Sequence, residues 1–109
     1  MGKLDTYFIK KFAERVNKVF CKRNLEILLC LYLTNKPLYT CEISNLLGGR
    51  EVSYYLKQLE KAGLVFRVRR MHPSLRVPAT YNYLTERGVE VVRFLRQKFS
   101  VEVNLIEER

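Results

Sequence analysis

The sequence changes its hydrophobic period at Gly63, and this change limits the folds that the chain can adopt. In residues 50–62, apolar side chains recur at helical spacing and form one stripe. That stripe contains Val52, Tyr55, Leu56 and Leu59. After Gly63, Phe66 and Val68 alternate with arginines, which is the pattern of a half-buried strand. The sequence therefore predicts a helix that ends at a glycine and leads directly into a strand.

Three more helices are predicted before this unit and one after it. Amphipathic periodicity places them at residues 4–20, 25–34, 41–47 and 86–99. We expect Asn24, Thr40 and Thr85 to act as N-caps. Pro37 ends the second helix, and the Gly48-Gly49 pair ends the third.

A second strand is predicted at residues 80–84, so that the two strands form a hairpin with a long tip. Residues 100–109 fit a helical extension, a short strand or a frayed tail equally well. The order helix, short helix, tight turn, helix, hairpin, helix is that of a winged helix-turn-helix. The predicted fold is therefore mainly α with a small β-hairpin, and it carries extra N- and C-terminal helices.

The same region resembles a known family. EVSYYLKQLEKAGLVFRVRR, followed by ATYNYLTERG, is similar to the signature of winged helix-turn-helix DNA-binding regulators of the ArsR and MarR type. The matching positions are Val52, Ser53, Leu56, Leu59, Glu60, Gly63, Leu64, Val65, Leu84, Thr85 and Gly88. The small size and basic charge also resemble regulators of archaea and their viruses. The chain departs from the family pattern between Leu47 and Val52, where GGRE is about two residues shorter than usual and lacks a Ser or Thr cap.

We expect residues 1–109 to form a single winged-helix domain. Its parts are an N-terminal dimerisation helix (1–22), the winged helix-turn-helix core (23–85), and a C-terminal helix with its tail (86–109). Dimerisation through terminal helices is implied by the resemblance, and the broad apolar stripes of these helices favour it as well. The expected interface residues are Phe8, Phe12, Val16, Val92, Leu95 and Phe99.

The net charge of +9 indicates an anionic partner. The charge is concentrated, because no acidic residue occurs between Glu60 and Glu86. We expect the helix 50–62 to enter the major groove of double-stranded DNA, and the hairpin 66–83 to contact the backbone or the minor groove. The expected DNA-binding residues are Arg50, Ser53, Tyr54, Lys57, Gln58, Lys61, Arg67, Arg69, Arg70, His72 and Arg76.

Two other interpretations of the basic residues stay open. The arginines of the hairpin also protect a sheet edge against pairing with other chains. Alternatively, the chain is a winged-helix interaction or assembly module whose basic face binds an acidic protein. The leading interpretation is a sequence-specific transcription regulator.

Cofactors, catalysis and location receive only general expectations. Three cysteines and one histidine at these spacings indicate no metal site and no cofactor, and no constellation typical of an enzyme is present. The cysteines fit ordinary thiols, with Cys21 and Cys41 as candidate redox-active thiols. We expect a cytoplasmic protein without a membrane span. A small-molecule effector between the helices stays an open alternative, because the sequence carries no signal for or against one.

Overall fold

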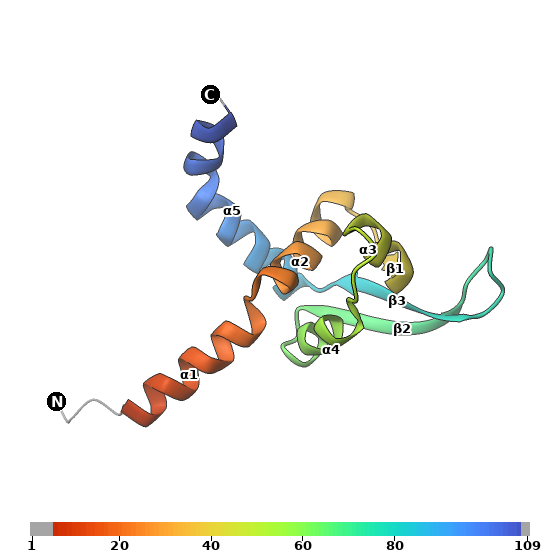
Figure 1. The fold of residues 1–109 in the computed structure, drawn as a ribbon, viewed down its shortest axis with the longest axis horizontal. Coiled ribbons are helices and arrows are strands. Elements are labelled where there is room, and N and C mark those ends of the chain that lie inside the picture. Colours follow the sequence, from red (N-terminus) through yellow and green to blue (C-terminus); the bar gives the residue numbers. More distant parts are fainter. Residues whose placement is uncertain (1–5, 108–109) are drawn as a thin grey trace.

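The computed structural model describes the backbone of residues 6–107 and the side chains of residues 6–98. Within this range the chain forms five helices and a small antiparallel sheet (Figure 1). The elements are α1 (Thr6–Val19), α2 (Lys22–Thr34), β1 (Leu38–Tyr39), α3 (Thr40–Leu46), α4 (Ser53–Lys61), β2 (Val65–Met71), β3 (Pro78–Leu84) and α5 (Glu86–Glu107). The prediction of a mainly α winged-helix fold with a hairpin is confirmed.

The sheet contains one strand that the sequence did not reveal. β1 pairs with β3 through Leu38 and Tyr39, which lie opposite Asn82 and Tyr81, and the strand order is β1-β3-β2. Two residues are too few to show an alternating pattern, so β1 could be found only from its partner. The hairpin itself is longer than predicted, because β2 and β3 remain paired as far as Met71 and Pro78.

The core lies where α2, α3 and α4 meet the start of the hairpin. Its fully buried side chains include Ile27 and Leu28 of α2, Ile43 of α3, and Leu56 and Leu59 of α4. The predicted stripe of α4 therefore faces inward, and Tyr55 packs at its margin. Burial of this stripe supplies most of the hydrophobic stabilisation that holds α4 in place.

Two predicted details of the helix ends are wrong. Asn24 does not cap α2 but lies inside the helix, fully buried, and its Nδ2 donates to the backbone oxygen of Lys18 at 2.8 Å. This hydrogen bond fastens the end of α1 to α2. Thr40 is the first residue of α3, and the backbone N–H of Tyr39 is bound by the Glu42 carboxylate at 2.9 Å.

The candidate recognition helix α4 begins at Ser53 rather than at residue 50. Gly48 and Gly49 both adopt left-handed backbone angles, with φ of 83° and 78°. The chain therefore turns twice after α3, and Arg50 and Glu51 stay in the loop before α4. The short GGRE segment leaves these two residues outside the helix.

The helices α1 and α5 extend beyond the rest of the fold, on the side away from the hairpin (Figure 1). The radius of gyration is 16.6 Å, whereas a compact chain of this length has about 13 Å. None of the side chains of α1, all of which lie in the described range, is buried. Val92, expected in a subunit interface, is instead buried in the core of this chain, and Phe99 lies beyond the residues whose side chains are described.

Across residues 6–107, no helix combines the length and the hydropathy that a membrane span requires.

A three-way junction joins α4, the hairpin and α5. Thr85 donates its hydroxyl to the Gly63 carbonyl at 2.7 Å and accepts the Gly88 N–H at 3.0 Å, which confirms its predicted role as the N-cap of α5. Its backbone N–H donates to the Leu64 carbonyl at 3.1 Å. At Gly88 the two segments approach so closely that a Cβ atom would overlap the Leu64 carbonyl oxygen and the side chain of Leu84.

We predict that Gly88→Ala lowers the free energy of unfolding by about 1–3 kcal/mol, because the added methyl group forces α5 away from the hairpin. In an exposed helix the same change is normally stabilising, so the sign of the effect is diagnostic. Urea denaturation measures it, with Glu90→Ala on the exposed side of α5 as the control. Gly88→Ala at or above wild-type stability would contradict the close approach.

Candidate nucleic-acid interface

The exposed side of α4 carries an aromatic ring between basic side chains. Tyr54 is 60% exposed, and Lys57 and Lys61 are exposed beside it, opposite the buried stripe of the helix. Tyr55 is half-buried and packs against the core. The two neighbouring tyrosines thus face different surroundings, as the helical period predicts.

The position of the Tyr54 side chain is restrained by its neighbours. Its hydroxyl accepts a hydrogen bond from Nε2 of Gln58 at 3.1 Å. The centroids of the Tyr54 and Tyr55 rings are 5.3 Å apart, in an edge-to-face arrangement. Gln58 is half-buried, and its Oε1 lies 3.5 Å from Nδ2 of the buried Asn24. Gln58 therefore connects the exposed face of α4 to α2 and holds the Tyr54 side chain in place.

A groove of about 390 Å³ connects the start of α4 with the hairpin. Ser53 lines one side and Arg69 the other, and Thr40, Cys41 and Thr80 are among the remaining lining residues. Ser53 is half-buried, and its backbone N–H donates to the Glu51 carboxylate at 2.6 Å. The start of α4 and the hairpin thus border the same groove, which Glu51 also lines.

Arg67 is part of a buried polar network. Its Nε donates to Oδ1 of Asn82 at 2.8 Å, and its Nη2 lies 3.4 Å from the Thr40 hydroxyl. Asn82 is fully buried and donates from Nδ2 to the Leu38 carbonyl at 3.0 Å. Burial lowers the pKa of Arg67, while the nearby Glu60 carboxylate acts in the opposite direction. An arginine stays charged under such conditions. Through the hydrogen bonds of Arg67 and Asn82, this network joins the hairpin to β1 and α3.

The other arginines of β2 are divided between the two faces of the sheet, because successive side chains of a strand alternate. Arg69 shares the face of Arg67 and is exposed at the groove. Arg70 lies on the opposite face, where it donates to the Tyr83 hydroxyl at 3.2 Å and covers the Tyr81 ring at 5.2 Å. Arg69 is thus exposed on the groove face of the hairpin, whereas Arg70 lies on the opposite face.

His72 organises the tip of the hairpin. Its Nδ1 accepts hydrogen bonds from the backbone N–H groups of Ser74 and Leu75, both at 3.1 Å. Its ring packs on the Tyr39 ring, with 4.5 Å between the ring centroids. Arg76 is exposed at this tip in a left-handed conformation with φ of 54°. The imidazole acts here as a hydrogen-bond acceptor that shapes the loop carrying Arg76.

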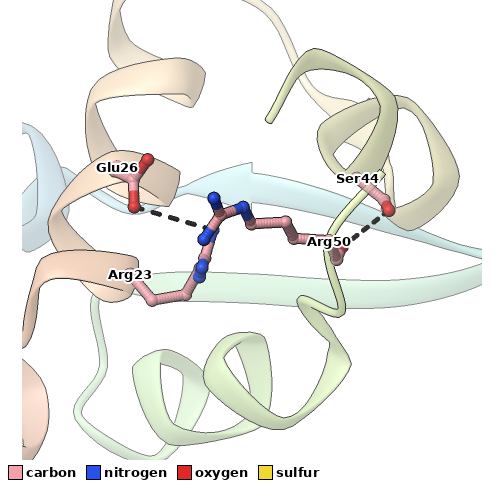
Figure 2. Close-up of polar contacts among 4 residues, drawn as sticks. All are labelled: Arg23, Glu26, Ser44 and Arg50. Carbon is pink, nitrogen blue, oxygen red and sulfur yellow. Dashed lines mark hydrogen bonds and ion pairs between the residues drawn. The ribbon is translucent and has the colours of Figure 1, made fainter. Parts of the chain in front are cut away.

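Arg50 lies apart from the exposed face of α4. It precedes the helix, and its backbone carbonyl accepts the Ser44 hydroxyl at 2.7 Å. Its side chain points from the loop toward Arg23 of α2 (Figure 2). The structure thus brings Ser53 and Arg69 to one groove and leaves Tyr54, Lys57 and Lys61 exposed on α4, whereas Arg50 lines a different cavity.

The cysteines differ in exposure. Cys41 is exposed on α3, whereas Cys21 and Cys30 are half-buried, and all three are free thiols. Desolvation raises the pKa of the Cys30 thiol. A role of Cys21 or Cys41 in redox chemistry stays a prediction.

Several residues of this region were not singled out from the sequence. Tyr81 and Tyr83 hold Arg70, Asn82 holds Arg67, and Arg23 lies beside Arg50. The alternation in TYNYL was the available signal, since it places the tyrosines on one face of β3 and Asn82 on the other. Arg23 carried no such signal, because its neighbour comes from a distant loop.

Comparison with known proteins identifies the fold. No protein-family model and no curated protein sequence matches the chain. Among solved structures, NadR in complex with 4-hydroxyphenylacetate is 20% identical with a TM-score of 0.69, and the match covers 99% of this chain and 81% of NadR. A transcriptional regulator of the MarR family from Enterococcus faecalis V583 is 19% identical with a TM-score of 0.69, over 99% of this chain and 94% of that protein.

A PadR-family transcription regulator from Clostridium difficile R20291 is similar over a shorter part of the chain. It is 20% identical with a TM-score of 0.60, and the match covers 77% of this chain and 95% of the regulator. The architecture is therefore that of winged-helix transcription regulators of the MarR and PadR type. At these identities, the comparison establishes the fold.

We predict that Tyr55→Ala lowers the free energy of unfolding by about 1–3 kcal/mol, because loss of the half-buried ring leaves a cavity beside the core. Tyr54→Ala should change it by less than ~1 kcal/mol, since the ring is largely in solvent. Thermal and urea denaturation of the two variants test this contrast. A larger loss for Tyr54→Ala would mean that α4 is rotated and that its exposed face is a different one.

Proposed function

We propose that this protein is a transcription regulator that binds double-stranded DNA in a sequence-specific manner. In this proposal α4 lies in the major groove, where Tyr54 and Ser53 reach base edges while Lys57 and Lys61 bind phosphates. The hairpin lies along the backbone, with Arg69 on its groove side and Arg76 at its tip near the minor groove. Two observations together carry the proposal: Lys57 and Lys61 are exposed on α4, and the start of this helix shares a groove with Arg67 and Arg69 of the hairpin.

The acidic residues nearest to this surface support the proposal, because each has a role within the chain. The carboxylate of Glu42 binds the Tyr39 N–H, and that of Glu51 binds the Ser53 N–H. Glu60 interacts with the charge of Arg67. The basic side chains around them are left with excess positive charge. Such a surface is better suited to binding a polyanion than to facing solvent alone.

The residues expected to bind DNA take different parts in this proposal. Arg67, Gln58 and His72 position other groups through their hydrogen bonds. Arg70 faces the opposite side of the sheet and contributes mainly to the general positive potential. Arg50 is left out of the DNA contacts. No enzymatic step is proposed, and a cytoplasmic location is consistent with this function.

We further propose that two copies associate through α1 and α5. The exposed apolar side chains Phe8, Phe12 and Val16 recur along one face of α1, at 63%, 60% and 39% exposure. An isolated helix of 14 residues is marginally stable in water, so an amphipathic helix with no buried side chain needs a partner surface. On α5, Phe94 is 58% exposed and Leu95 is half-buried, which replaces Val92 as the apolar contribution of this helix.

The proposed phosphate contacts make the affinity for DNA depend on salt. The protein should bind random duplex DNA with an affinity that falls steeply as salt rises, and Arg69→Ala should reduce the salt slope by ~1 per lost phosphate contact in each subunit. Lys10→Ala removes the same charge from α1 and should leave the slope unchanged. Fluorescence anisotropy at several salt concentrations measures both.

Sequence readout requires a second comparison. On a duplex selected from a random library, Tyr54→Ala should cost ~1–3 kcal/mol of binding free energy, and on random DNA it should cost little. If duplex DNA is not bound even at low salt while polyglutamate is, the alternative of an acidic protein partner is correct.

The proposed association of two copies determines the mass of the protein in solution. Sedimentation at micromolar concentration should give twice the chain mass of 13.0 kDa, and Phe12→Glu should yield the monomer, because it places a charge in the apolar contact. Leu75→Glu is the matched control, since Leu75 is 61% exposed at the hairpin tip. A wild-type monomer would disprove the dimer.

A further inference from the structure

A cavity beside α4 contains basic side chains that DNA binding does not explain. It has a volume of about 550 Å³ and lies between the first turn of α2, the end of α3 and α4. The lining residues are Cys21, Lys22, Arg23, Glu26, Leu46, Leu47, Arg50 and Tyr55. We infer that this cavity binds a small phosphate monoester between Arg23 and Arg50.

The arrangement of the two arginines is the main observation. Arg50 extends from the α3–α4 loop, and Arg23 extends from α2, so that their guanidinium groups point toward each other (Figure 2). Two like charges repel when they are brought together, most strongly where water is partly excluded. The Arg23 side chain is only 18% exposed, so this pair is costly unless an anion lies between its members.

The single carboxylate nearby does not satisfy the pair. Oε1 of Glu26 lies 3.6 Å from Nη1 of Arg23, whereas good charge-assisted hydrogen bonds are about 2.7–2.9 Å long. Within the described residues, this Nη1 is buried and makes no hydrogen bond. Buried donors are rarely left without an acceptor in folded proteins, so this N–H is available to an acceptor from outside the chain.

The loop that carries Arg50 is built to hold it in this place. Gly48 and Gly49 use left-handed angles that other residues rarely adopt, and the Gly49 N–H donates to the Ser44 carbonyl at 2.7 Å. The Ser44 hydroxyl then holds the Arg50 carbonyl, also at 2.7 Å (Figure 2). The short GGRE segment, which departs from the family pattern, is thus the segment that directs Arg50 into the cavity.

The first turn of α2 adds to the positive potential. The N-terminus of a helix carries a partial positive charge, which acidic residues or caps usually offset. This first turn contains no acidic residue, Cys21 forms no side-chain capping bond there, and Lys22 and Arg23 occupy its first positions. An anion in the cavity would offset the helix dipole and both guanidinium groups together.

The composition of the site indicates the class of anion. Lys22, Arg23 and Arg50 against Glu26 leave a net charge of about +2, which matches the dianion of a phosphate monoester. Guanidinium groups bind phosphate oxygens in a bidentate manner. Tyr55 and Leu46 form apolar walls, and Leu46 is 59% exposed, so an organic group attached to the phosphate would cover it.

We assign the phosphate to a free small molecule rather than to the DNA backbone. Tyr55 and Tyr54 point to different sides of α4, so the cavity lies off the exposed face that carries Tyr54. The Arg23 side chain is only 18% exposed, which favours a small anion that enters the cavity over the backbone of a duplex. Binding at this site does not depend on the proposed regulatory function.

Titration calorimetry with phenyl phosphate, in the absence of DNA, tests the inference. We expect saturable binding of one molecule per chain, weakened about tenfold or more by Arg23→Gln and by Arg50→Gln because each removes a charge-assisted contact. Glu26→Gln should strengthen binding, since it removes the carboxylate that competes for Arg23. Lys10→Gln, which lowers the net charge equally, should have no effect.

Three results would overturn the inference: no saturable binding, equal weakening by Lys10→Gln, or weaker binding in Glu26→Gln. A fourth would assign the pair to the DNA backbone. In that case phenyl phosphate does not bind the free protein, and Arg50→Gln lowers the salt slope of DNA binding by ~1 per subunit. Failure of the chain to bind any DNA would refute the proposed function and leave the phenyl phosphate result standing.

Discussion

The junction at Thr85 determines how the parts of this protein are arranged relative to one another. Thr85 binds the carbonyls of Gly63 and Leu64, which lie in the turn between α4 and β2, and it also caps α5. Gly88 allows the two segments to touch at this point, because a side chain there would overlap the Leu64 carbonyl. The position of α5 against this turn and the end of the hairpin therefore depends on a few hydrogen bonds and one close approach.

The hairpin serves two purposes because its strands have two faces. On the groove side, Arg67 and Asn82 form a network that fastens the sheet to α3, and Arg69 extends beyond this network into the groove. On the other side, Tyr81 and Tyr83 hold Arg70. A run of arginines that looks uniform in the sequence is thus divided into structural and exposed members by the period of the strand.

The loop before α4 decides the role of Arg50, which the helical period alone would assign to the exposed face of α4. Two left-handed glycines and the Ser44 hydroxyl instead place Arg50 beside Arg23. The same segment that shortens the helix supplies the second half of a cationic cavity.

Sequence alone determined the periodic features of this protein. The inward stripe of α4, the outward Tyr54, the cap at Thr85 and the winged-helix order all follow from local spacing, because helices and strands repeat at known intervals. Only the tertiary structure decided which side chains meet across distant segments. Asn24 and Val92 are buried, Arg67 forms a hydrogen bond with Asn82, and β1 pairs with β3. Arg50 and Arg23 line the same cavity. Such contacts depend on loop lengths and on packing between elements, and neither leaves a repeating pattern along the chain.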